Sequence, residues 1–414
     1  MSILKSPFGR IVGINLFLMI ALQSTYFVGI IGCATYDLGA GALEVSALTF
    51  TLNTLLVLGN LASGPVIDWI GPRKTLLALL AATALTGLFE WLSPVSYPSL
   101  FFAAMANGFF FGAATTAVDA YPRFFSEDAR ELSRTNSFSQ VATGIAVILG
   151  PALAAWICTW APNRCVFSIM AAAPFPALAL AWATREEKPV GKQVHAEKSA
   201  RLAKAEGKAA AAEKPNFFHE VLEGVKIVLT HDDLRILFII SFLGFFAYGA
   251  FDSLESLFYR DVLRVDSDWM GWLSSASGVG GTLGSLLVLK VDHKKLSTWL
   301  LSMVLVLVGV GSMIYTGTPF VLVAAVGQVV TGIGFGMLAP IRNTLMQMRS
   351  EPATIGRVAS VMRVAMNSAG ALPLLAAPAL SAAFGPQAVL FGASTFAAAV
   401  GVVCAVAYRG TRVK

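Results

Sequence analysis

Long apolar segments separated by short polar ones dominate the chain. A helix that crosses the hydrocarbon layer of a membrane needs about 20 mostly apolar residues. Runs of this kind occur twelve times, which predicts an all-α integral membrane protein with twelve transmembrane helices. The first run is too long, and is followed by too many others, to be a cleaved signal peptide. The predicted spans are residues 10–33, 43–69, 72–92, 97–121, 136–160, 164–184, 234–262, 267–290, 296–316, 320–345, 355–382 and 386–408.

The charged residues indicate how these spans are oriented. Only 13% of the residues are charged and 56% are hydrophobic, whereas an ordinary globular domain has about 25% charged residues. Most of the 30 Lys and Arg residues fall in segments that alternating spans place on one side of the membrane. Because cationic residues concentrate in cytoplasmic loops, we expect both termini to be cytoplasmic, in a bacterial inner membrane. The net charge of +6 therefore reflects topology, and we expect the lipid bilayer and no nucleic acid as partner.

A polar segment near the middle divides the chain. Residues 185–215 are rich in Ala, Lys and Glu and have little to bury, so they form a solvated helix or stay disordered. Residues 217–229 have apolar side chains at helical spacing, which is typical of a helix in the inner membrane interface. We therefore predict three parts: an N-terminal six-helix bundle (1–184), a cytoplasmic linker with an amphipathic helix (185–233) and a C-terminal six-helix bundle (234–414).

An internal repeat supports two related halves. Residues 134–151 superpose on residues 357–374, with Arg, Ser, Val and Ala at matching places. In the preceding spans, the segment from Asn107 to Gly112 matches the segment from Thr331 to Gly336. Parallel halves of this kind are found in transporters built from two similar bundles.

The segment between the second and third spans has a distinctive pattern. Residues 64–74 read Gly-Pro-Val-Ile-Asp-Trp-Ile-Gly-Pro-Arg-Lys. This resembles the loop G-x-x-x-D-x-x-G-[RP]-[RK]-[RK] of the major facilitator superfamily. The resemblance implies a major facilitator fold of two pseudo-symmetric bundles. It also implies that the protein transports a small molecule and is not an enzyme. It also implies a conformational latch, in which the aspartate caps a neighbouring helix and pairs with a basic residue. The latch residues are Gly64, Asp68, Gly71, Arg73 and Lys74.

Within that superfamily the chain is most similar to the twelve-helix exporters that exchange drugs or siderophores for protons. Gly144, Gly150 and Pro151 in the fifth span resemble the glycine-proline motif of antiporters. The fourth span departs from the group, because Ala104 stands where many drug antiporters have an arginine. The resemblance implies that a proton gradient is the energy source, with no cofactor, and that the protein is a monomer.

Two carboxylates in the seventh span are the candidates for proton coupling. Asp252 and Glu255 share one helical face with Phe245, Tyr248 and Tyr259, which recur at steps of three and four. An ionisable group inside the hydrocarbon is costly and usually serves a function. Two carboxylates one turn apart in a poor solvent favour the proton-bound form of at least one. The alternative is that both are hydrated at the outer mouth of the helix.

Polar and aromatic residues of the other spans are candidates for a substrate cavity. If the resemblance holds, the first, fourth, seventh and tenth helices line it. Arg363 stays charged, so it pairs with a carboxylate, binds an anion, or reaches to the inner interface. Each amide can equally serve helix packing. The cavity candidates are Gln23, Tyr26, Asn53, Asp119, Phe245, Tyr248, Gln328, Phe335, Arg363 and Asn367.

These features favour proton-coupled export of a small amphipathic molecule, a drug-like compound or a siderophore, by rocking of the two bundles. The alternative is an importer, a proton symporter or a facilitator of a small organic anion, with Arg363 and Arg342 as counter-charges. A transport-inactive scaffold is the third class. Cys158 and Cys165 flank a predicted outer loop and form a disulfide or remain free. The cysteines have no metal-ligand spacing, and the chain has no phosphate-binding loop, which argues against ATP-driven transport.

Overall fold

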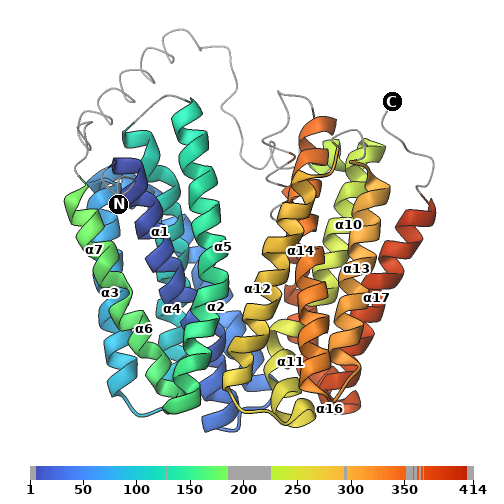
Figure 1. Ribbon diagram of the computed structural model, residues 1–414, viewed down its shortest axis with the longest axis horizontal. Coiled ribbons are helices and arrows are strands. Elements are labelled where there is room, and N and C mark those ends of the chain that lie inside the picture. The colour runs from blue at the N-terminus through green and yellow to red at the C-terminus, as the bar shows by residue number, and fades with distance from the viewer. Residues whose placement is uncertain are drawn as a thin grey trace. The chain divides into compact units, whose positions relative to one another are not determined.

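The computed structural model describes residues 6–125, 129–184, 225–292, 296–350, 358, 361–362, 365–366 and 368–407. Helices are the only regular elements in these ranges, and no strand occurs in them (Figure 1). Eleven of the described helices are long and apolar enough to cross a membrane, and the shorter apolar helix Ala371–Phe384 accompanies them. The prediction of an all-α membrane protein with twelve spans is confirmed. Most of the predicted linker, and the start of its amphipathic helix, lie outside the described residues.

The residue contacts divide the chain into two compact units. The first contains the helices between Pro7 and Ala183, apart from Gly41–Ser46, and it also takes in Ser267–Ser275. Its elements are α1 (Pro7–Ser24), η2 (Thr25–Ile31), η3 (Cys33–Asp37), α2 (Ala42–Ile70), α3 (Pro72–Leu92), α4 (Tyr97–Ala120), η4 (Tyr121–Phe124), α5 (Ala129–Trp160), η5 (Asn163–Val166), α6 (Phe167–Ala172) and α7 (Pro174–Ala183).

The second unit contains the C-terminal helices. The boundary predicted between the halves falls in the linker, so it stays a prediction. The elements of this unit are α10 (Asp232–Tyr248), α11 (Phe251–Leu257), η6 (Phe258–Leu263), α12 (Asp268–Leu289) from Ala276 onward, α13 (Thr298–Thr316), α14 (Val321–Arg349), α16 (Ala371–Phe384) and α17 (Pro386–Ala407).

Corresponding glycines make the same backbone contact in each unit. A Cβ atom placed on Gly108 or Gly112 of α4 would lie 2.2 or 2.0 Å from a carbonyl oxygen of α2. A Cβ atom on Gly332 or Gly336 of α14 would lie 2.1 or 2.0 Å from a carbonyl oxygen of α12. Small residues let membrane helices approach this closely. The segments that the sequence repeat aligns therefore perform the same packing role in both units.

The surface of the helices is suited to lipid. Each unit has its own core of buried aliphatic side chains, with Ile14 and Leu80 in the first and Leu237 and Leu305 in the second. Large apolar side chains elsewhere are exposed, including Trp160 at the end of α5, which is 79% exposed. Tryptophan at helix ends is typical of the membrane–water interface.

The connection between α2 and α3 is a sharp turn at Gly71 and Pro72, as the motif indicates. Gly71 has φ 88°, a conformation that favours glycine, and Pro72 opens α3. The connection between α16 and α17 uses the same pair of residue types. There, Gly385 has φ 80° and Pro386 opens the helix.

The seventh span is one continuous segment, Leu234–Leu263, which agrees with the run predicted over 234–262. Helix α10 ends at Tyr248 and α11 begins at Phe251. At the two-residue turn between them, a Cβ atom on Gly249 would lie 2.3 Å from the carbonyl oxygen of Gly370, so the two backbones touch. Sequence periodicity cannot predict this contact because Gly370 is distant in the chain. Asp252 lies in the first turn of α11.

Candidate functional site

Glu255 lies at the centre of a polar cluster inside the second unit. Its Oε1 atom accepts hydrogen bonds from the Tyr259 hydroxyl at 3.0 Å, the Tyr315 hydroxyl at 2.9 Å and the Gln328 Nε2 at 2.8 Å. Gln328 Nε2 also lies 3.2 Å from the Tyr259 hydroxyl. Tyr259 and Tyr315 are fully buried and Gln328 is 5% exposed. Side chains from η6, α13 and α14 thus converge on one carboxylate of α11.

The chemistry of this cluster suits a group that gains and loses a proton. The three donors are neutral, and within the described residues Glu255 takes part in no ion pair. When Glu255 is ionised, the donors stabilise the carboxylate by hydrogen bonding. When its other oxygen is protonated, Oε1 remains an acceptor for the same donors. The cluster can therefore persist in both protonation states, whereas a salt bridge would favour the charged one.

Asp252 is the second carboxylate of α11, one turn before Glu255. Its side chain is exposed, while that of Glu255 is half-buried. The two carboxylates interact electrostatically. One acid is therefore accessible and the other enclosed, an arrangement in which a proton can pass from the surface of the unit toward its interior.

A second polar chain lies beside the first. The Tyr248 hydroxyl and the Ser312 hydroxyl are 2.8 Å apart, and Ser312 lies 3.1 Å from the Thr331 hydroxyl. The Tyr248 ring also packs edge-on against Phe335, with 4.9 Å between the ring centroids. Of the cavity candidates in this unit, Phe245 and Tyr248 lie one turn apart on α10, and Tyr248 contacts Phe335 of α14.

The cavity candidates of the first unit do not form such a cluster. Gln23 and Tyr26 are half-buried, while Asn53 and Asp119 are exposed. Asn15, another polar residue of the first span, donates to the Ser139 carbonyl and to the Thr143 hydroxyl, both at 2.9 Å. That residue connects α1 to α5 and thus serves helix packing.

The latch residues have separate surroundings. Arg73 donates to the carbonyls of Ala181 at 3.2 Å and Trp182 at 2.8 Å, and its guanidinium lies over the Trp182 ring at 5.8 Å. It therefore caps the last turn of α7, where carbonyls lack helical partners. Lys74 is exposed, and a Cβ atom on Gly64 would have no neighbour within 4 Å. The side chain of Asp68 lies outside the described residues, so the latch itself stays a prediction.

The antiporter-like motif is only partly explained by packing. A Cβ atom on Gly150 would lie 3.1 Å from the Cβ of Gln23 and 3.2 Å from the carbonyl oxygen of Ile20, so α5 contacts α1 there. A Cβ atom on Gly144 would have open space, and Pro151 lies within α5.

The remaining predictions concern Arg363, Asn367, two cysteines and metal binding. Arg363 and Asn367 lie outside the described residues, so their roles stay predictions. Cys158 and Cys165 are both free thiols, with no disulfide between them. In the described ranges, no group of three His, Cys, Asp or Glu side chains is arranged to hold a metal ion.

Two functional candidates escaped the sequence analysis. Tyr315 could not be chosen from the pattern, because it is one of many residues in an apolar run. Glu90 did carry a signal, since it is a carboxylate inside the predicted span 72–92. It is 3% exposed, and its Oε1 has no hydrogen-bond partner in the described part of the chain.

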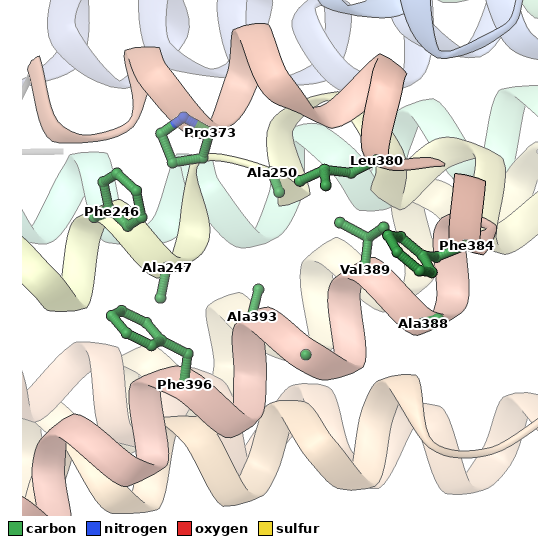
Figure 2. A pocket seen from close by; sticks show the side chains of 11 residues that line it. Phe246, Ala247, Ala250, Pro373, Leu380, Phe384, Ala388, Val389, Ala393 and Phe396 are labelled. Carbon is green, nitrogen blue, oxygen red and sulfur yellow. The ribbon is translucent and has the colours of Figure 1, made fainter. Parts of the chain in front are cut away.

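A pocket of about 420 Å³ lies elsewhere in the second unit. Figure 2 shows the side chains that line it, which are apolar and come from α10, α16, α17 and Ala250 between α10 and α11. Phe246 and Phe396 meet edge-on within it, with 6.3 Å between the ring centroids. The pocket shares no residue with the Glu255 cluster, so we place the candidate chemistry at the cluster.

Comparison with known proteins identifies the family. The model of the Major Facilitator Superfamily matches residues 13–373. The chain belongs to this superfamily. It is therefore a membrane transporter, and the resemblance that the loop motif indicated is confirmed.

Among similar proteins of this superfamily, the multidrug efflux pump Tap of Mycobacterium tuberculosis (strain ATCC 25618 / H37Rv) is 25% identical over 364 residues, covering 84% of this chain and 80% of the pump. The crystal structure of the nucleoside transporter NupG is similar with a TM-score of 0.70 and 12% identity, covering 97% of this chain and 99% of NupG. A POT family transporter in complex with 5-aminolevulinic acid has a TM-score of 0.70 and 14% identity, with coverages of 98% and 96%. At this low identity, the two solved structures show that the fold is shared and nothing about function.

Proposed function

We propose that this transporter exports a small amphipathic molecule in exchange for protons, by alternating access. The observation that carries the proposal is the Glu255 cluster. Glu255 is enclosed by three neutral donors and lies one turn from the exposed Asp252. A carboxylate inside a membrane-spanning segment, with no ion pair among the described residues, is suited to bind and release a proton in each cycle.

In the proposed cycle the two carboxylates have different tasks. Asp252, which is exposed, takes up the proton, and Glu255, which is half-buried, holds it while the transporter changes state. Protonation removes a charge from a site of low polarity and so favours the conformations in which that site is closed to water. Release of the proton on the other side resets the transporter. A ligand or a proton shifts such an equilibrium only by its differential affinity for the two states.

The similar efflux pump supports export over import. The similar pump of Mycobacterium tuberculosis is called a multidrug efflux pump, and its similarity extends over most of both chains. The aromatic side chains Tyr248 and Phe335 beside the cluster suit a bulky, partly apolar solute.

The test is a transport assay in proteoliposomes with an imposed proton gradient. A pH-sensitive dye reports proton movement while lipophilic cations, siderophores and organic anions are added singly. We expect one class of solute to dissipate the gradient with the unmodified protein but not with Asp252→Asn or Glu255→Gln. If labelled solutes equilibrate without any proton movement, or if both variants still couple, the proposal is wrong.

Import of a small organic anion is the alternative, and one observation favours an anionic substrate. Arg342 on α14 has a buried guanidinium nitrogen with no partner in the described ranges. The direction of solute movement in the same proteoliposomes distinguishes the two, because an importer accumulates the solute along the proton gradient and an exporter against it.

A further inference from the structure

Arg342 has unusual surroundings for an arginine in a membrane helix. It lies in α14, which is one of the helices apolar enough to span a membrane. Its guanidinium carbon lies 6.0 Å from the centroid of the Phe245 ring on α10. Among the described residues, the Nε and Nη2 atoms contact the neighbouring Asn343 Oδ1, at 3.4 and 3.3 Å. Nη1 is buried and has no hydrogen-bond partner among the described residues.

This environment does not fit an arginine that simply reaches toward water. Such a side chain buries its aliphatic stem and keeps its charged nitrogens solvated, whereas Nη1 of Arg342 is shielded from solvent. The guanidinium keeps its charge at any relevant pH. No carboxylate in the described part of the chain forms an ion pair with it. A buried donor of a charged group without an acceptor is costly, so an anion bound at Nη1 would be stabilised there.

Aromatic side chains extend this site along the same two helices. Tyr248 lies one turn after Phe245 on α10, and its ring packs edge-on against Phe335. Phe335 lies two turns before Arg342 on α14. All four side chains are half-buried. Together they form an aromatic strip that ends in a cation, which we call the Arg342 strip.

The geometry points to a binding site for an organic anion with an aromatic ring. The guanidinium would bind the carboxylate or sulfonate group through paired hydrogen bonds. The ring of the solute would pack on Phe245, Tyr248 and Phe335. This inference rests on the proposed transport function and names the class of substrate.

The cationic end of the Arg342 strip is distant from the Glu255 cluster within the same unit. Gln328 of the cluster and Arg342 are 14 positions apart on α14, which corresponds to about 21 Å along a helix. The anionic group therefore does not compete with the proton for one site. A positively charged solute would be repelled by Arg342, so the strip also selects against cations.

The experiment measures equilibrium binding to the purified full chain in detergent, without any proton gradient. The probes are radiolabelled naphthalene-2-carboxylate and its neutral twin, naphthalene-2-carboxamide. The variants are Arg342→Gln, Arg342→Lys and Arg349→Gln. Arg349 is a matched control on the same helix, because its Nη1 donates to the Thr298 hydroxyl at 2.7 Å.

We expect the unmodified protein to bind the carboxylate at least tenfold more tightly than the amide. Arg342→Gln should bring the two affinities within about threefold of each other, while Arg349→Gln keeps the preference. Arg342→Lys should retain part of it, since lysine keeps the charge but not the planar fork. Equal affinities in the unmodified protein, no binding of the carboxylate, or a preference that survives Arg342→Gln would overturn the inference.

The outcome is independent of the proton-coupling proposal. Binding without a gradient does not require Asp252 or Glu255 to carry a proton, so Glu255→Gln should keep the carboxylate preference. If the preference is present and proton coupling is absent, the protein is a facilitator of aromatic anions. If coupling is present and the preference is absent, the Arg342 strip is not the substrate site.

Discussion

Replacing Glu255 by leucine should destabilise the second unit, because three buried donors lose their common acceptor. The Tyr259, Tyr315 and Gln328 side chains all donate to Glu255 Oε1. Hydrogen bonds between membrane helices average about 0.6 kcal/mol each, and those in soluble proteins about 1 kcal/mol. Loss of three bonds therefore lowers the free energy of unfolding by roughly 2–3 kcal/mol.

Glutamine at the same position separates the hydrogen bonds from the charge. Its amide oxygen can accept from the same three donors, so Glu255→Gln should cost less than about 1 kcal/mol. Both variants are compared with the unmodified protein by equilibrium unfolding in mixed detergent micelles. Glu131→Leu is the control, because Glu131 is exposed. If Glu255→Leu unfolds like the unmodified protein, or if glutamine is as damaging as leucine, the cluster does not have the role described.

Three further substitutions test the packing by the same unfolding measurement. Gly249→Ala should lower the free energy of unfolding by about 1–3 kcal/mol, because its Cβ would meet the Gly370 backbone at 2.3 Å. Its control, Gly392→Ala, has open space and should be neutral or stabilising; equal effects would refute the contact. Glu90→Leu should raise the free energy of unfolding by about 1–3 kcal/mol, since Glu90 Oε1 is buried without a hydrogen-bond partner in the described residues. A loss of stability there would indicate an unseen structural role. Arg73→Gln should lower it by about 1–3 kcal/mol by uncapping α7, and no change would contradict the cap.

Local rules of sequence explain most of the fold. The number and position of the spans follow from runs of apolar residues, since a helix in lipid must satisfy its backbone within itself. The turn at Gly71 and Pro72 follows from the conformational limits of those residue types. The helical period likewise placed Asp252, Glu255 and Tyr259 on neighbouring turns of one span, and the structure has Glu255 hydrogen-bonded to Tyr259.

The parts that could not be predicted depend on contacts between distant segments. Tyr315 reaches Glu255 only because α13 packs beside α11, and its own sequence surroundings are uniformly apolar. The close approach of the Gly249 and Gly370 backbones joins two segments that are far apart in the chain. The motif indicated a basic residue at position 73 but not that Arg73 would cap α7.

The central claim is that Glu255, together with Asp252, carries the proton that drives transport. The most direct measurement is proton release from the purified protein in weakly buffered detergent, followed with a pH-sensitive dye when the substrate found in the proteoliposome assay is added. The account predicts release of protons from the unmodified protein and none from the Asp252→Asn, Glu255→Gln double variant, with substrate binding retained. Equal release from both proteins would contradict it.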